Sequence, residues 1–142
     1  MVDLYELATV NQERNDQIVE ILKKFFAQLG GVSFASVVSM EGLPIVHYPP
    51  QLPKDIDDTR VAAMTAAMLS LGERAAMEVG SGSLVRIFVE GDDGYLISTS
   101  AGETAVLTIA VSKTVKLGLI FHDLATAAKA VAEILDQEQT TA

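Results

Sequence analysis

Three short runs of strand-forming residues lie between Ser83 and Val111, and they constrain the fold more than any other feature of the sequence. Ser83–Glu90, Tyr95–Ser100 and Thr104–Val111 are rich in β-branched and aromatic residues, and short segments containing glycine and acidic residues separate them. This pattern predicts a three-stranded antiparallel meander. The third run is apolar at almost every position, as expected of a central strand covered on both faces. The sheet therefore needs helices above and below it.

A shorter hairpin is predicted ahead of the meander. Val32–Ser39 is β-branched and alternating, and Pro44–Tyr48 has the composition of a short returning strand. Gly42, in the turn between them, is free to take a positive φ. Because Pro44 has no backbone N–H to donate, the second of these strands is expected at an edge of the sheet.

Amphipathic helices are predicted near both ends of the chain. The first begins at Asn15 or Asp16, either of which can cap it, and ends at about Leu29. The last runs from Gly118 to about Gln137, and both have apolar residues at three- and four-residue spacing. The residues expected to face the sheet are Ile18, Ile21 or Leu22, Phe25 and Leu29 in the first helix, and Ile120, Leu124, Ala127, Ala128, Val131, Ile134 and Leu135 in the last.

The chain of 142 residues has the length of one ordinary domain, which we place at residues 15–137. Residues 1–14 are polar with scattered apolar side chains, and they form either a short additional helix or a flexible arm. Residues 138–142 are polar and are expected to form a frayed tail.

The helix between the hairpin and the meander has two apolar faces. It begins at Asp57 or Asp58 and continues to about Val79, with no charged residue between Arg60 and Glu73. One stripe comprises Val61, Met64, Met68, Leu71, Ala75 and Val79, and the opposite one comprises Ala62, Ala66, Leu69 and Ala76. Since one sheet covers only one face, the second face indicates a contact with another copy of the chain or with another protein. The alternative is that small alanines tolerate exposure to solvent. The residues predicted to form a homodimer interface are Ala62, Ala66, Leu69, Glu73, Ala76, Val85 and Ile87.

No motif for catalysis, or for a cofactor or metal, is found in the sequence. There is no cysteine, and the two histidines, His47 and His122, lie on different predicted elements. Gly80–Ser83 connects a helix to a strand, the reverse of the order in a phosphate-binding loop. The acidic clusters Asp55–Asp58 and Glu90–Asp93 lack the spacing of a calcium loop and suit a helix start and a turn. We therefore expect a protein without enzymatic activity, catalytic residues, cofactor or bound metal.

The charge of the chain limits its partners. Ten Lys and Arg residues against nineteen Asp and Glu residues leave a net charge of −9, which argues against nucleic acids and anionic membranes. The N-terminus lacks the pattern of a signal peptide, and the charge-free run Val61–Gly72 is too short to span a bilayer. We expect a cytoplasmic protein that does not insert into membranes.

Several local sequences resemble the Roadblock family of dynein light-chain type. The resemblance extends from about Ile18 to Leu135 and includes the hairpin Val37–Ile45, where an Asp/Glu-Gly turn is followed by Leu-Pro. It also includes Leu71–Arg74 with the Leu-Val-Arg-Ile-Phe run that follows, and Lys116–Ile120 at the start of the last helix. Each motif alone is weakly specific, but their order and spacing together are characteristic.

This resemblance implies an α/β fold of the α+β sandwich type, similar to profilin. A five-stranded antiparallel sheet in the order 2-1-5-4-3 would carry the second helix on one face and the other two helices on the opposite face. Relatives dimerise through the second helix and the third strand, and many regulate or scaffold small Ras-like GTPases, while others link cargo to dynein. The leading hypothesis is a non-enzymatic homodimeric platform that binds and regulates or localises a small Ras-like GTPase. The alternative is a profilin-like small-ligand or sensory domain, or a general scaffold of a protein complex.

Overall fold

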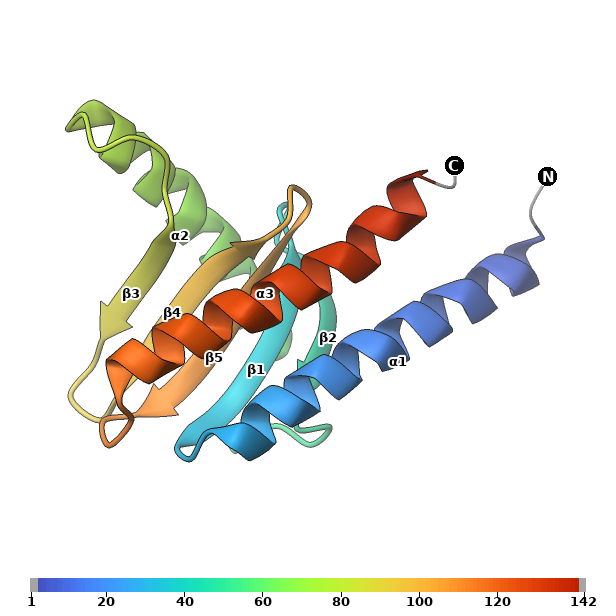
Figure 1. Cartoon of the computed structure of the whole chain (residues 1–142), viewed down its shortest axis with the longest axis horizontal. Coiled ribbons are helices and arrows are strands. Elements are labelled where there is room, and N and C mark those ends of the chain that lie inside the picture. Colours follow the sequence, from blue (N-terminus) through green and yellow to red (C-terminus); the bar gives the residue numbers. More distant parts are fainter. Residues whose placement is uncertain (1–2, 141–142) are drawn as a thin grey trace.

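The computed structural model describes residues 3–140, which form three helices and one antiparallel sheet (Figure 1). The helices are α1 (Leu4–Gln28), α2 (Asp58–Glu78) and α3 (Leu117–Thr140). The strands are β1 (Val32–Ser39), β2 (Pro44–Tyr48), β3 (Arg86–Glu90), β4 (Gly94–Ala101) and β5 (Ala105–Ser112). The five strands lie in the order β2-β1-β5-β4-β3, which confirms the predicted topology.

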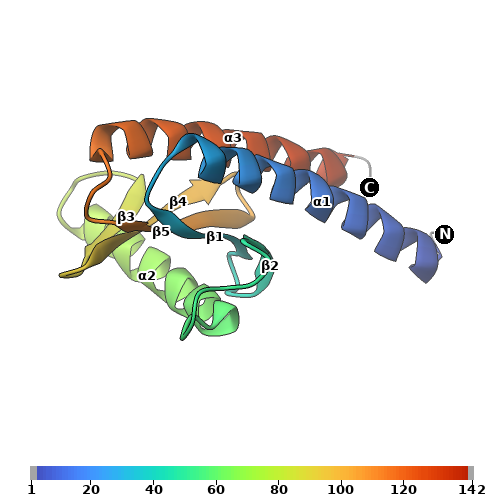
Figure 2. The same cartoon turned by 90° about the horizontal axis from the view of Figure 1, so that it is seen from below.

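The molecule has three layers. Helices α1 and α3 lie side by side on one face of the sheet, and α2 crosses the other face (Figure 2). This arrangement of one helix against two is the predicted one. The large core between the sheet and α1/α3 contains almost all of the residues expected to face the sheet, including Ile18, Leu22 and Phe25 from α1 and Ile120, Leu124 and Val131 from α3.

The meander forms as predicted, with β5 at the centre of the sheet. Ile109 of β5 pairs with Ala35 of β1 on one side and with Ile97 of β4 on the other. At the β3–β4 turn, the N–H of Gly91 donates to the carbonyl of Gly94 at 2.9 Å. The β1–β2 turn is also the predicted one, since Gly42 has a φ of +89°, and β2 lies at an edge of the sheet.

Helix α1 begins eleven residues earlier than the sequence analysis predicted at Asn15. Asp3 caps it, and its carboxylate accepts a hydrogen bond from the Tyr5 N–H at 2.9 Å. No glycine or proline interrupts the chain between Asp3 and Gln28, so the helix passes through Asn15 and Asp16 without a break. The division of the chain at residue 15 therefore has no counterpart in the secondary structure.

Helix α3 also extends farther than predicted. It continues to Thr140, so residues 138–140 of the expected tail are helical. Residues 141 and 142 of that tail lie outside the described residues.

Candidate protein-interaction surface

The N-terminus of α2 is attached to the sheet by its two acidic residues. Asp57 caps the helix, and its carboxylate accepts a hydrogen bond from the Arg60 N–H at 3.3 Å. The carboxylate of Asp58 accepts a hydrogen bond from the Ser36 hydroxyl of β1 at 3.1 Å. The cluster around these residues thus serves as a helix start, as predicted.

Small residues let α2 approach the sheet closely. Ala62, Thr65 and Leu69 are its buried residues, and Ala62 and Leu69 pack with Val38 and Val106 in a second, small core. Farther along, a Cβ atom at Gly72 would lie 2.5 Å from the Cδ1 atom of Ile87. The close approach at Gly72 favours small residues along this face, and Leu69 is the one large residue among the buried three.

This packing reverses the two faces that the sequence analysis assigned to α2. Ala62 and Leu69, predicted at a homodimer interface, are buried within the chain's own core, where they pack against Val38 and Val106 of the sheet. The other predicted interface residues lie nearer the surface. Ala66, Ala76 and Ile87 are half-buried, whereas Glu73 and Val85 are exposed.

Several large apolar residues at α2 are exposed. Met64, Leu71 and Met77 are 50%, 67% and 66% exposed, and Val79, just after the helix, is 76% exposed. Three of these belong to the stripe of larger residues that the sequence shows along this helix. A protein surface seldom carries such a run of exposed large apolar side chains unless another protein covers it. We refer to Met64, Leu71, Met77 and Val79 as the exposed apolar residues of α2.

Strand β3 also exposes apolar side chains, at the edge of the sheet. Within the described residues β3 pairs with β4 alone, so its other edge has no neighbouring strand. Phe88 and Val89 are each 39% exposed, and Val85, just before the strand, is 65% exposed. An open edge with apolar side chains is a template for pairing with another strand.

Aromatic contacts hold β3 in place against β4 and α3. The ring of Phe88 lies 5.0 Å from that of Tyr95 and 6.0 Å from that of Phe121, centroid to centroid. The guanidinium of Arg86 lies 4.6 Å from the centroid of Phe121. These contacts give the edge strand a defined position before any partner binds.

A pair of opposite charges lies beside this cluster. Lys113 forms an ion pair with Glu90, and the hydrogen bond with that carboxylate raises the pKa of the Lys113 ammonium above its ordinary value. The ammonium also lies 4.7 Å from the centroid of Tyr95.

The described residues contain no group of three or more His, Asp and Glu side chains placed to hold a metal ion. Nδ1 of His47 lies 3.0 Å from the Pro49 carbonyl oxygen. Gly80 terminates α2 with a φ of +71°, and the Ser81 N–H donates to the Ala76 carbonyl at 2.8 Å, so this segment serves as a helix end. Across residues 3–140, no helix is both long enough and apolar enough to cross a membrane.

Comparison with known proteins places the chain in a family. The model of the Roadblock/LC7 domain matches residues 18–111. The chain belongs to the Roadblock/LC7 domain family. Among curated proteins it is similar to two uncharacterized proteins of Methanocaldococcus jannaschii. MJ0310 is 37% identical over 90 residues, which are 63% of this chain and 75% of that protein. MJ0714 is 36% identical over 90 residues, which are 63% and 73% of the two chains.

Solved structures of Roadblock/LC7 proteins share the fold. The gliding protein MglB from Thermus thermophilus aligns with a TM-score of 0.78 and 22% identity over 87% of this chain and 92% of its own. MglB from Myxococcus xanthus aligns with a TM-score of 0.72 and 21% identity over 88% and 96% of the two chains. A Roadblock/LC7 domain from Streptomyces avermitilis aligns with a TM-score of 0.74 and 21% identity, over 82% and 95%.

The sequence analysis of this Roadblock/LC7 domain missed part of the exposed apolar surface. It expected the third predicted strand at the interface and named Val85 and Ile87 from it, but it did not single out Phe88 and Val89. Met77 lies outside the stripes identified on α2. The available signal for Phe88 and Val89 was their place in the same predicted strand as Val85 and Ile87.

Proposed function

We propose that this Roadblock/LC7 protein is a homodimeric platform, without enzymatic activity, that binds a small Ras-like GTPase and regulates or localises it. The homodimer is supported above all by two neighbouring features, the exposed apolar residues of α2 and the open edge of β3. The GTPase is supported by the family resemblance, since many Roadblock proteins regulate or scaffold such enzymes.

The sequence of β3 suits pairing with a second copy of itself. In an antiparallel pair of strands, residues that lie opposite each other point to the same face of the sheet. If a two-fold axis perpendicular to the sheet relates the strands, one residue must therefore lie opposite its own copy, and the axis passes between these two copies. We call this an axis through that residue. An axis through Phe88 would place Arg86 opposite Glu90 of the second copy, and Ile87 opposite its Val89. Each pairing joins opposite charges or two apolar side chains, as stable cross-strand pairs require. An axis through Arg86 or Glu90 would oppose like charges.

A hollow in the sheet supports the same arrangement. It has a volume of about 480 Å³, lies at the end of β3 near Gly91, and is lined by Val89, Leu96 and Ala110 among others. The C-terminal half of α2 extends past the opposite end of β3 (Figure 1). The two-fold axis places the start of one β3 strand beside the end of the other. It would therefore bring the α2 of the second copy over the hollow. The C-terminal half of that helix, which includes Leu71 and Met77, would then lie over an apolar sheet surface.

The homodimer is tested by sedimentation at micromolar concentration with two matched variants. Leu71→Asp places a charge in the proposed contact and should cost several kcal/mol of association free energy. Leu119→Asp changes an equally apolar residue, 51% exposed at the start of α3, and should leave the dimer intact. A monomeric wild-type protein, or a dimeric Leu71→Asp variant, would contradict the proposal.

The GTPase is tested separately. The small Ras-like GTPases of the source organism, loaded with GDP or a non-hydrolysable GTP analogue, are titrated into the dimer by calorimetry. Saturable binding to at least one of them, with a preference for one nucleotide state, is the expected result. If none binds, the profilin-like ligand domain or a general scaffold becomes the better account.

A further inference from the structure

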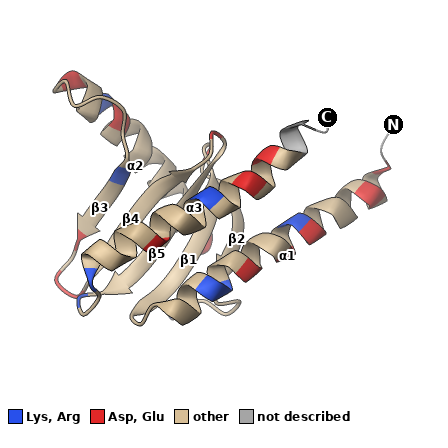
Figure 3. Ribbon diagram, viewed as in Figure 1, with Lys and Arg blue, Asp and Glu red and all other residues tan. Residues whose placement is uncertain are grey.

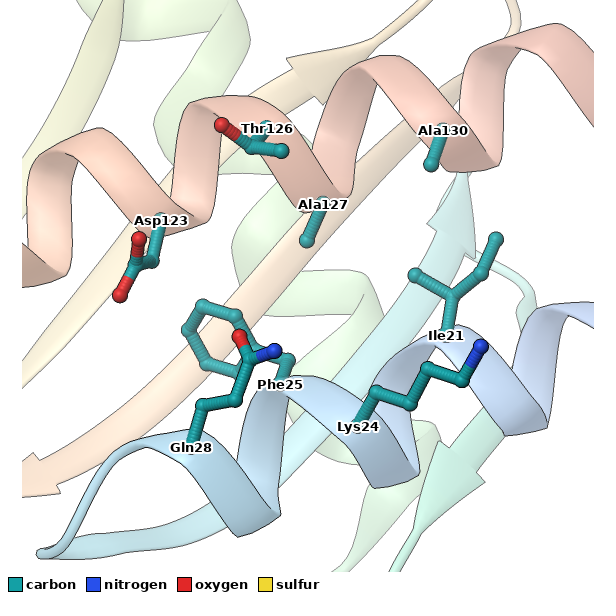
Figure 4. A pocket seen from close by; sticks show the side chains of 8 residues that line it. All are labelled: Ile21, Lys24, Phe25, Gln28, Asp123, Thr126, Ala127 and Ala130. Carbon is teal, nitrogen blue, oxygen red and sulfur yellow. The ribbon is translucent and has the colours of Figure 1, made fainter.

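A groove lies between α1 and α3 on the outer surface of the two-helix layer (Figure 4). Its floor consists of the Phe25 ring with Ile21, Ala127 and Ala130, and its volume is about 270 Å³. The two alanines leave space that larger side chains would fill. The groove is therefore an apolar depression that the chain itself leaves open.

Polar side chains of opposite charge border this groove. Lys24 and Gln28 come from α1, and Asp123 comes from α3 (Figure 4). Asp123 is half-buried, yet among the described residues it has no hydrogen-bond or ion-pair partner, and neither has Lys24. A partly desolvated carboxylate gains from a cation that reaches it. The neighbouring Thr126 hydroxyl offers no alternative, because it donates to the His122 carbonyl at 3.2 Å.

We propose that the groove is a docking site for a short amphipathic helix of another protein. Two apolar side chains of that helix, one turn apart, lie over Phe25 and between the alanines. An arginine or lysine of the helix pairs with Asp123, and a carboxylate pairs with Lys24. The net charge of −9 on the chain favours a helix that is basic overall.

The shape of the groove favours a helix over a small molecule. Its lining runs from Ile21 to Gln28 on α1 and from Asp123 to Ala130 on α3, which corresponds to about 10 Å of helix, or two turns. The volume is below the roughly 300–1,000 Å³ of typical small-molecule sites. Helices commonly bind in such apolar grooves through residues spaced by three or four positions.

This site is independent of the surface proposed for dimerisation. The groove lies on the face of the sheet opposite α2 (Figure 2) and none of its residues comes from β3. Charged residues of both signs surround it on α1 and α3 (Figure 3), in contrast to the charge-free stretch of α2. Pairing of two β3 strands about an axis perpendicular to the sheet would leave two such grooves open on one side of the dimer.

The probe for this site is a stapled helical peptide of about 14 residues, since unstapled helices of that length are marginal in water. It carries two leucines four residues apart, an arginine on one flank and a glutamate on the other. Methyl NMR spectra of the full chain should show saturable shifts at Ile21, Ala127 and Ala130. Ala130→Trp fills the groove and should abolish these shifts, whereas Ala125→Trp, on the exposed side of α3, should not.

The charge pairing has its own test. Asp123→Lys should lower the affinity for the arginine peptide by about tenfold. A peptide with glutamate in place of that arginine should bind the Asp123→Lys variant with the lost affinity restored. Absence of saturation up to about 1 mM, or equal loss in the Ala130→Trp and Ala125→Trp variants, would overturn the proposal. The proposal would also be overturned if L-arginine amide alone saturated the site and the peptide bound no more tightly than this compound. That result would indicate a small cation as the ligand. Sedimentation and GTPase binding of Ala130→Trp should match the wild type, so failure of this site is distinguishable from failure of the proposed function.

Discussion

Gly94 begins β4 where the backbone passes close to the neighbouring strand. A Cβ atom at this position would lie 2.6 Å from the carbonyl oxygen of Val111, whereas one at Gly91 would approach no atom closer than 3.6 Å. Gly94→Ala should therefore lower the free energy of unfolding by about 1–3 kcal/mol, because two paired strands must separate. Gly91→Ala is the matched control and should change it by less than about 0.5 kcal/mol. Urea denaturation of both variants measures the difference, and equal midpoints would contradict the close approach.

At the scale of single elements, α2 differs from α1 and α3 in how it is held. The two outer helices share a large apolar core with the sheet, whereas α2 packs on a small cluster and covers the polar residues Ser36, Ser98 and Thr108. The hydroxyls of Ser98 and Thr108 bond to each other at 2.8 Å. The buried hydroxyl of Thr65, on α2 itself, has no partner among the described residues. We infer that α2 is the least firmly attached of the three helices.

Thr65→Val tests this inference. Removal of a buried unsatisfied hydroxyl should raise the free energy of unfolding by about 1 kcal/mol, and amide hydrogen exchange should slow in α2 more than in α1 or α3. Thr126→Val, which removes an exposed hydroxyl from α3, is the control and should leave both unchanged. In the wild type, α2 should exchange before the other helices. Faster exchange in α3, or a loss of stability in Thr65→Val, would refute the inference.

Elements with local periodicity could be predicted from the spacing of residues, whereas the strand order and the layering could be predicted only from the family resemblance. The meander and the stripe from Ile18 to Phe25 were predicted because each depends on the spacing of neighbours along the chain. The start of α1 was placed at Asn15 because asparagine caps helices well, but a good capping residue inside a longer helix does not end it. The faces of α2 were reversed because periodicity shows that the helix has two apolar stripes, but not which of them faces the sheet. The groove between α1 and α3 could not be predicted, because it forms only where helices from the two ends of the chain lie side by side.

At the scale of the whole molecule, the pairing register of the homodimer can be read with single cysteines, because the chain contains none. With an axis through Phe88, the two copies of that residue face each other at a Cα distance of about 4.5–5.5 Å, within the range that a disulfide spans. Phe88→Cys should therefore cross-link under mild oxidation. Ile87→Cys and Val89→Cys should not cross-link alone but should do so when mixed. Efficient self-cross-linking of either would show that the axis passes through that residue instead.

A dimer of this chain that stimulates a GTPase should do so without supplying a catalytic arginine. An arginine finger must reach the nucleotide phosphates from an extended, positioned segment, and it contributes roughly 10³–10⁵ to the rate. The arginines of the chain are Arg14, Arg60, Arg74 and Arg86. All four lie within helices or strands, where Arg14 bonds to Asn15 at 2.9 and 3.0 Å and Arg86 stacks on Phe121. None is on a loop that could extend into another protein's active site.

Any stimulation of hydrolysis should therefore come from ordering the GTPase's own switch loops, which shifts the population of its conformations. Single-turnover hydrolysis with each Arg→Ala variant is the decisive measurement, with binding checked in parallel by calorimetry. Each variant that binds normally should retain stimulation within about tenfold of the wild type. A loss of about a thousandfold from one substitution, with binding intact, would identify a catalytic arginine and refute this mechanism. Because Arg86 also stacks on Phe121, its variant needs a sedimentation control, so that a weakened dimer is not taken for lost catalysis.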